Sequence, residues 1–141
     1  MYGEHCIDVY GAKIIGGHTE GEALKLDVLS FLGDIDSRTG VVVSEDTNAK
    51  GQYVKDRVLI VKKFRGSTVG VYILYSLCKN GLAPKAIVSE EPDPVVIAGV
   101  VLCNITGVFK VPRMAIVQIE NGDMVRIEPL ENGVKICVVK G

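Results

Sequence analysis

The residues most suited to chemistry lie at positions 62–72, in the segment KKFRGSTVGVY. A cation, a glycine and two hydroxyls follow one another there, at Arg65, Gly66, Ser67 and Thr68. The apolar stretch before them predicts a buried strand, and the spacing of the residues after them predicts a helix. The first amides of a helix lack intrahelical partners, and the helix dipole favours an anion beside them. The junction therefore predicts a site for a carboxylate or a phosphate, with Arg65 as its cation.

A purely structural interpretation of the same junction is a helix cap, because serine is among the preferred N-cap residues. The segment matches neither a Walker A loop nor a nucleophile elbow. The two histidines, His5 and His18, both precede Ser67, so the hydrolase order of serine, acid and histidine is impossible. We interpret both histidines as surface or loop residues. The residue types alone leave a cap, an anion site and a catalytic hydroxyl open.

Two strand–helix pairs are predicted around this junction. RVLIVKKF at 57–64 indicates a buried strand, and a helical face follows it at Val71, Leu74, Tyr75 and Cys78. KAIVSE at 85–90 indicates the next strand. Asp93-Pro94 is typical of an N-cap followed by proline at the first helical position, and it predicts a helix over 94–103.

The segments before and after these pairs favour β-structure. Strands are predicted within EALKLDVL (22–29), VVV (41–43), MAIVQI (114–119), MVRIEP (124–129) and VKICVVK (134–140), with turns at ENGD and LENG. We therefore expect one α/β domain over residues 1–141, with helices on one side and β-structure wrapping the other.

Composition excludes some partners and indicates a compartment. The chain has 141 residues, is 48% hydrophobic and has a net charge of −1, with no run of basic residues of the kind that binds nucleic acid or anionic membranes. The most apolar stretch, at 95–109, is shorter than the roughly 20 residues of a membrane span. The first residues do not resemble a signal peptide. We expect a cytoplasmic protein that binds neither nucleic acid nor membrane.

The four cysteines, Cys6, Cys78, Cys103 and Cys137, are widely spaced and form no C-x-x-C pair. Metal and cluster sites usually draw their ligands from closely spaced pairs. We expect free cysteines, with Cys78 and Cys103 packed as small apolar side chains. We also expect this chain to hold no metal by itself.

Several longer stretches resemble a known family. EALKLDVLSFLGDID, VLIVKKFRGSTVG, NGLAPKAIV, EPDPVVIAGVVL and NGDMVRIE occur in the order found in small subunits of phosphomevalonate dehydratase, which are related to the swivel domain of aconitase X. The resemblance covers roughly residues 13–138. It implies a swivelling β/β/α domain, like the C-terminal domain of aconitase. It also implies a two-subunit hydro-lyase, active only with a large subunit that carries a [4Fe–4S] cluster.

The resemblance also implies a substrate and residue roles. The substrate would be mevalonate 5-phosphate, dehydrated to trans-anhydromevalonate 5-phosphate in an archaeal-type mevalonate route to isoprenoids. The serine after the glycine of the motif is the family's proton acceptor, which corresponds to Ser67, while Arg65, Gly66 and Thr68 are expected to bind substrate. Hydroxyproline dehydratases belong to the same relatives, so another hydroxy acid is an alternative. A non-catalytic module that binds a small anion is the alternative from a different class.

This sequence departs from the family pattern at two places. Asp34 stands where related sequences often have a second glycine after Ser-Phe-x-Gly, and Val71 stands where many have a serine. Near the same motifs, we expect a partner to cover the segments 30–36 and 64–70. Phe31, Leu32 and Phe64 would then lie at the interface, although each could instead enter the core of this domain.

Overall fold

The computed structural model describes residues 3–66 and 68–141 and arranges them around one mixed β-sheet. The strand order in this sheet is β1-β8-β7-β3-β4-β5-β6-β2. The strands are β1 (His5–Tyr10), β2 (Lys13–Ile15), β3 (Thr19–Leu29), β4 (Arg57–Phe64), β5 (Ala86–Ser89), β6 (Thr106–Phe109), β7 (Met124–Leu130) and β8 (Gly133–Val139). The antiparallel strands β7 and β8 are joined at the predicted LENG turn.

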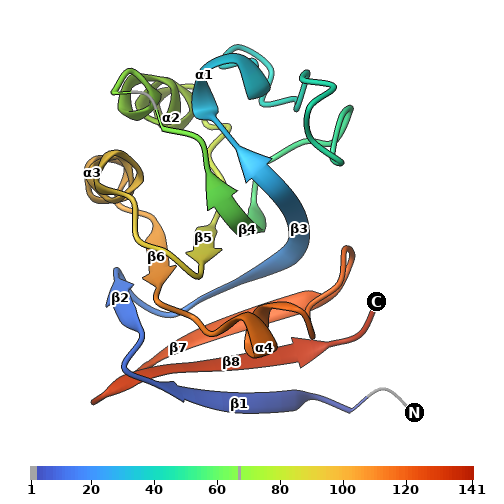
Figure 1. Ribbon diagram of the computed structural model, residues 1–141, viewed down its shortest axis with the longest axis vertical. Coiled ribbons are helices and arrows are strands. Elements are labelled where there is room, and N and C mark those ends of the chain that lie inside the picture. Colours follow the sequence, from blue (N-terminus) through green and yellow to red (C-terminus); the bar gives the residue numbers. More distant parts are fainter. Residues whose placement is uncertain (1–2, 67) are drawn as a thin grey trace.

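Parallel strands form the middle of the sheet. β3 pairs with β4, β4 with β5 and β5 with β6, all in parallel. The start of β3 instead pairs antiparallel with β7, and the long strand curves from one half of the sheet into the other (Figure 1). Because parallel strands end at a common edge, the segments after β3, β4 and β5 are brought together there.

Two ten-residue helices, α2 (Gly70–Lys79) and α3 (Pro94–Cys103), cover one face of the parallel strands. The short turns α1 (Phe31–Asp34) and α4 (Arg113–Ile116) follow β3 and β6. β1, β7 and β8 fold under the opposite face, so the layers run β, β, α (Figure 1). This is the predicted arrangement of a swivelling β/β/α domain.

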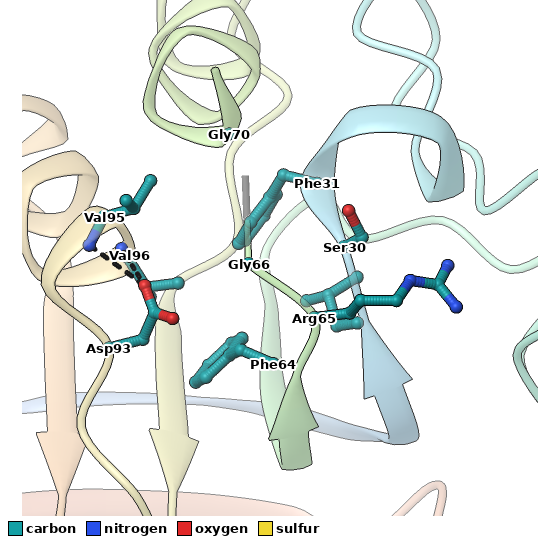
Figure 2. Close-up of a pocket in the computed structure, with 10 residues that line it drawn as sticks. Ser30, Phe31, Phe64, Arg65, Gly66, Gly70, Asp93, Val95 and Val96 are labelled. Atoms are coloured by element: carbon teal, nitrogen blue, oxygen red, sulfur yellow. Dashed lines mark hydrogen bonds between the residues drawn. The ribbon is translucent and has the colours of Figure 1, made fainter. Parts of the chain in front are cut away.

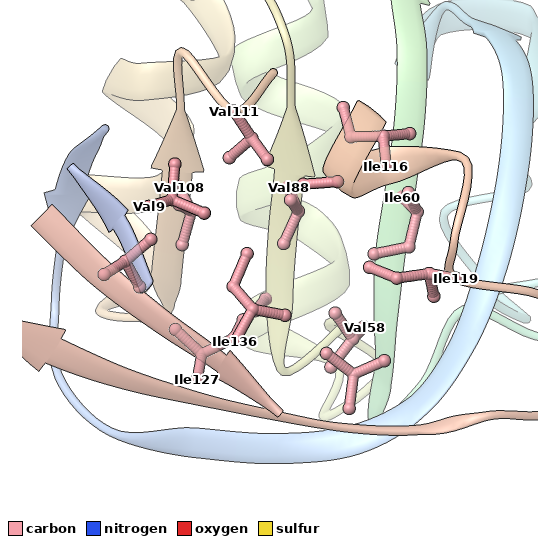
Figure 3. Close-up of a cluster of buried hydrophobic side chains, with 14 of the residues drawn as sticks. Val9, Val58, Ile60, Val88, Val108, Val111, Ile116, Ile119, Ile127 and Ile136 are labelled. Atoms are coloured by element: carbon pink, nitrogen blue, oxygen red, sulfur yellow. The ribbon is translucent and has the colours of Figure 1, made fainter. Parts of the chain in front are cut away.

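The parallel strands bury both faces. In β4, Val58 and Ile60 join one apolar cluster, while Leu59 and Val61 join another. The first cluster lies between the two β layers and is completed by Ile127 and its neighbours (Figure 3). The second lies under the helices. Alternation along a strand with two apolar faces explains why 57–64 has a nearly continuous apolar sequence.

Two predictions for individual elements are wrong, and one strand was missed. The strand expected at 114–119 is replaced by the helical turn α4, which buries Ala115 and Ile116 and leaves Met114 exposed. The segment 41–43 makes only isolated bridges, Val41 with Tyr53 and Val42 with Ile35. β1 was not anticipated. Its pairing partner β8 lies more than 120 residues further along the sequence, so no local sequence pattern predicts that the two strands pair.

The expectation of free cysteines is also wrong. Cys6 is bonded to Cys137 across the paired strands β1 and β8, and Cys78 is bonded to Cys103 between α2 and α3. The Cα atoms of Cys78 and Cys103 are 5.7 Å apart, a usual spacing for a disulfide. The fold makes neighbours of residues that are 131 and 25 positions apart in sequence. Sequence spacing could not reveal these pairs.

Candidate functional site

A small recess forms at the edge where the parallel strands end. It is lined by Ser30 after β3, by Arg65 and Gly66 after β4, and by Asp93 after β5 (Figure 2). Gly70, Phe31, Phe64 and the first residues of α3 complete its wall. The predicted junction therefore lies in a concave site built from three neighbouring strand ends, which is the usual place for ligands in parallel sheets.

The predicted catalytic residue, Ser67, lies outside the described residues. Its neighbours place the turn: Gly66 follows the end of β4, Thr68 is exposed in the turn, and α2 begins at Gly70. The N-cap position of α2 is Val69, two residues after Ser67.

Arg65 is bound to the segment that follows β3. Its backbone amide donates to the carbonyl of Leu29 at 2.9 Å. Its guanidinium Nη2 lies 3.5 Å from Oδ1 of Asp34, whose side chain is 3% exposed, whereas the Arg65 side chain is 55% exposed. The cation predicted at the junction is therefore present, half in solvent and paired with a buried carboxylate.

Asp93 brings a second carboxylate to the recess. Its Oδ1 accepts hydrogen bonds from the amides of Val95 at 2.9 Å and Val96 at 3.1 Å, which confirms the predicted N-cap of α3. Its Oδ2 would lie 4.0 Å from a Cβ atom placed on Gly66. Arg65 and Asp93 thus extend to opposite sides of the turn (Figure 2). The sequence predicted Asp93 as a helix cap but not as a site residue. Its position directly after a predicted parallel strand, β5, could have indicated that it lies at the site.

The recess holds little by itself. Its volume is about 10 Å³, room for about one water molecule. Sites that enclose small ligands usually have about 300–1,000 Å³. A substrate of several carbons would therefore lie over the turn rather than inside this chain, and a second surface would have to close over it.

The apolar residues beside the recess divide between two environments. Phe31 is buried in the domain's own core, and Phe64 packs against the same cluster, so the expectation of an interface role is wrong for Phe31. Leu32 is 48% exposed, and its role at an interface stays a prediction. Both histidines are exposed, as expected, His5 at the start of β1 and His18 before β3.

Comparisons with known proteins agree with this arrangement. The family profile of the aconitase X swivel domain matches residues 8–136. A phosphomevalonate dehydratase small subunit from Thermococcus sibiricus is 41% identical over 119 residues, covering 84% of this chain and 89% of that protein. Its counterpart from Methanosarcina acetivorans is 37% identical and covers 96% of this chain and 94% of its own length.

A solved structure shows the same fold over nearly the whole chain. The crystal structure of Thermococcus kodakaraensis aconitase X in its holo form superposes with a TM-score of 0.81 at 29% identity, and the match covers 98% of this chain and 99% of that one. The observed fold and the sequence relationships agree with one another. The chain belongs to the aconitase X swivel domain family.

Proposed function

We propose that this chain is the small subunit of a phosphomevalonate dehydratase. The complete enzyme would remove water from mevalonate 5-phosphate and give trans-anhydromevalonate 5-phosphate, in an archaeal-type mevalonate route. The observation that carries the proposal is the Arg65-Gly66 turn at the shared edge of the parallel strands, open to solvent in a chain related over most of its length to small subunits of that enzyme.

Within this function, Ser67 is the proton acceptor. It would take the proton from the carbon next to the substrate carboxylate, while the hydroxyl leaves from the neighbouring carbon as hydroxide. This proton and this hydroxide together make up the water that is released. Arg65 would bind an anionic group of the substrate, and the turn around Gly66 and Thr68 would offer backbone and hydroxyl donors. A serine hydroxyl is a weak base, so it acts in this way only where positive charge stabilises its alkoxide.

The charges of this chain do not supply that stabilisation alone. Arg65 is the cation lining the recess in the described part of the chain; it is paired with the carboxylate of Asp34, and the carboxylate of Asp93 lies on the other side of the turn. The three side chains carry one positive and two negative formal charges. The amides at the start of α2 add a partial positive charge. The rest of the positive charge that stabilises the alkoxide would have to come from a second protein. A second protein is also needed to cover the open recess.

We propose that the second protein is a large subunit that carries a [4Fe–4S] cluster. The cluster would act as the Lewis acid that helps the substrate hydroxyl to leave. The cysteines of this chain do not fit such a group, because all four are paired in disulfides. Glu4 lies close to Cys6 and Cys137, but its carboxylate is bound by Arg126. This chain would therefore contribute the serine and the anion-binding turn, and its partner the cluster.

The location of the enzyme is also a proposal. None of the helices within residues 3–66 and 68–141 is long and apolar enough to cross a membrane. We propose that the two subunits act in the cytoplasm. Disulfides are rare in most cytosolic proteins but common in those of hyperthermophiles.

The test is reconstitution of the pair with Ser67→Ala. If Ser67 is the proton acceptor, the variant should lose about 10²–10⁴-fold in kcat, the usual contribution of a positioned base. KM should change much less, because the backbone donors of the turn remain. Turnover is measured as consumption of mevalonate 5-phosphate by the purified two-subunit complex.

Thr68→Ala is the matched control, since it removes the neighbouring exposed hydroxyl. It should keep most of the turnover at saturating substrate, and the loss of a hydroxyl donor to the substrate should appear as a rise in KM. Assembly of each variant with the large subunit is checked by size-exclusion chromatography. Near-normal turnover of an assembled Ser67→Ala complex would refute the role of the serine, and a wild-type pair that acts only on hydroxyproline would refute the substrate.

A further inference from the structure

Asp34 is a charged residue buried at the edge of the site. It ends the short turn α1, directly after β3, and only 3% of its side chain is exposed. Charged side chains are almost never buried this fully without a partner. The contacts of this carboxylate therefore indicate what it does.

Three hydrogen bonds, two with Ser30 and one with Val43, hold Asp34 in place. Its Oδ2 accepts the backbone amide of Ser30 at 2.7 Å. Its own amide donates to the carbonyl of Ser30, and its carbonyl accepts from the amide of Val43 at 2.8 Å. The carboxylate is thus a fixed point that does not depend on a flexible side chain or on solvent.

The other carboxylate oxygen faces Arg65. Oδ1 lies 3.5 Å from Nη2 of the guanidinium, and 55% of the arginine side chain is exposed. The backbone bond from Arg65 to Leu29 ties together the two strand ends that carry the pair. A guanidinium has five N–H donors in a rigid plane, so contact with one oxygen leaves donors for a ligand.

We propose that Asp34 is a positioning residue that holds the guanidinium of Arg65 ready for an anionic group of the substrate. This inference rests on the proposed function and names a further residue for the same site. An unrestrained arginine samples many rotamers and must give up that freedom when it binds an anion. A buried, immobile carboxylate limits the rotamers before the substrate arrives.

The test is Asp34→Asn in the reconstituted pair. Asparagine has nearly the same size, and its carbonyl oxygen can still accept the amide of Ser30, so the variant removes the charge and keeps the turn. KM for mevalonate 5-phosphate should rise about 5- to 10-fold, the cost of ordering one long side chain on binding. kcat should stay within about 2-fold, because binding in the ground and transition states is weakened alike.

The background variant Arg65→Gln separates positioning from a general structural role. If Asp34 acts through Arg65, adding Asp34→Asn to Arg65→Gln should change KM no further. An equal rise in KM in both backgrounds, or an unchanged or lowered KM in the single variant, would overturn the inference.

A second variant applies if Asp34→Asn does not assemble. Arg65→Lys keeps the charge but loses the planar fork, and it should raise KM by a similar factor; an unchanged KM would overturn the inference. Failure of the proposed function gives a different result, because the wild-type pair would then not dehydrate mevalonate 5-phosphate at all.

Discussion

Among the described residues, neither the backbone conformation nor the packing at position 66 requires a glycine. The backbone there does not have the positive φ that glycine favours, and within residues 3–66 and 68–141 an added Cβ would meet only Oδ2 of Asp93, at the ordinary contact distance of 4.0 Å. Gly16, by contrast, has a φ of +84°, and a Cβ on it would lie 2.8 Å from the carbonyl oxygen of Ile105. The absence of a side chain at position 66 is therefore better explained by something that approaches the turn from outside.

This difference predicts the result of Gly66→Ala. The free energy of unfolding should change by less than about 1 kcal/mol, and the prediction allows either sign of this change. kcat/KM of the reconstituted pair should fall at least about 10-fold, because a methyl group would keep the substrate away from the turn amides. Chemical denaturation and steady-state kinetics measure the two quantities on the same preparations.

Gly17→Ala is the matched control. A Cβ at Gly17 meets nothing within 4 Å, and the residue lies before β3, outside the recess. This variant should leave both stability and kcat/KM unchanged. Full activity in Gly66→Ala would show instead that no ligand approaches this part of the backbone closely.

Among the elements, those that build the site were the most predictable. β4, α2 and α3 each carry a strong local signal: a continuous apolar run, an apolar face at helical spacing, and the Asp93-Pro94 start. The bounds of β4 agree with the prediction residue by residue. Such elements follow from periodicity and capping, which depend on neighbours in sequence.

The elements that were missed depend on distant contacts. β1 forms because β8 offers it an edge, and α4 forms because Ala115 and Ile116 fill a gap between the two β layers. The same holds within the site. The pairing of Asp34 with Arg65 and the approach of Asp93 to Gly66 arise from strands that become neighbours only in the fold. No local pattern in the sequence specifies these contacts.

A disulfide links α2 to α3 and contributes to the stability of the two helices. Both helices start at the recess, and the Cys78–Cys103 disulfide joins their far ends. Replacing both cysteines by serine should lower the free energy of unfolding by about 3 kcal/mol, the expected effect of opening a loop of this length. Denaturant unfolding of the isolated chain under non-reducing conditions provides the measurement.

The Cys6–Cys137 bond serves as the internal comparison, because it lies on the β1–β8 pair and away from the helices. Alkylation of the denatured, unreduced wild-type chain should label none of the four cysteines. Labelling of Cys78 and Cys103, together with a serine variant as stable as the wild type, would mean that this pair is not bonded.

The molecule as a whole carries an incomplete site at one edge of a well-packed sheet. Two apolar clusters support the sheet from both sides, so the strand ends are held rigidly. The recess between them has room for about one water molecule, and its charged side chains do not favour an alkoxide. A rigid half-site of this kind is suited to closing against a second surface, which would supply the missing volume and charge.

The second surface should lie over the two segments that carry the recess, 30–36 and 64–70. Leu32, on α1, and Tyr72, near the start of α2, are exposed large side chains on two elements that contribute to the wall of the recess. Exposed apolar side chains around a site favour protein contact. Adding the large subunit should slow amide hydrogen exchange in the segments 30–36 and 64–70 by at least about 10-fold, because burial and ordering reduce local opening. The hairpin at 130–133 lies at the opposite end of the fold and should exchange at its original rate (Figure 1). Unchanged exchange in both recess segments, in a complex that is assembled and active, would place the partner on another face and would separate this turn from the catalytic centre.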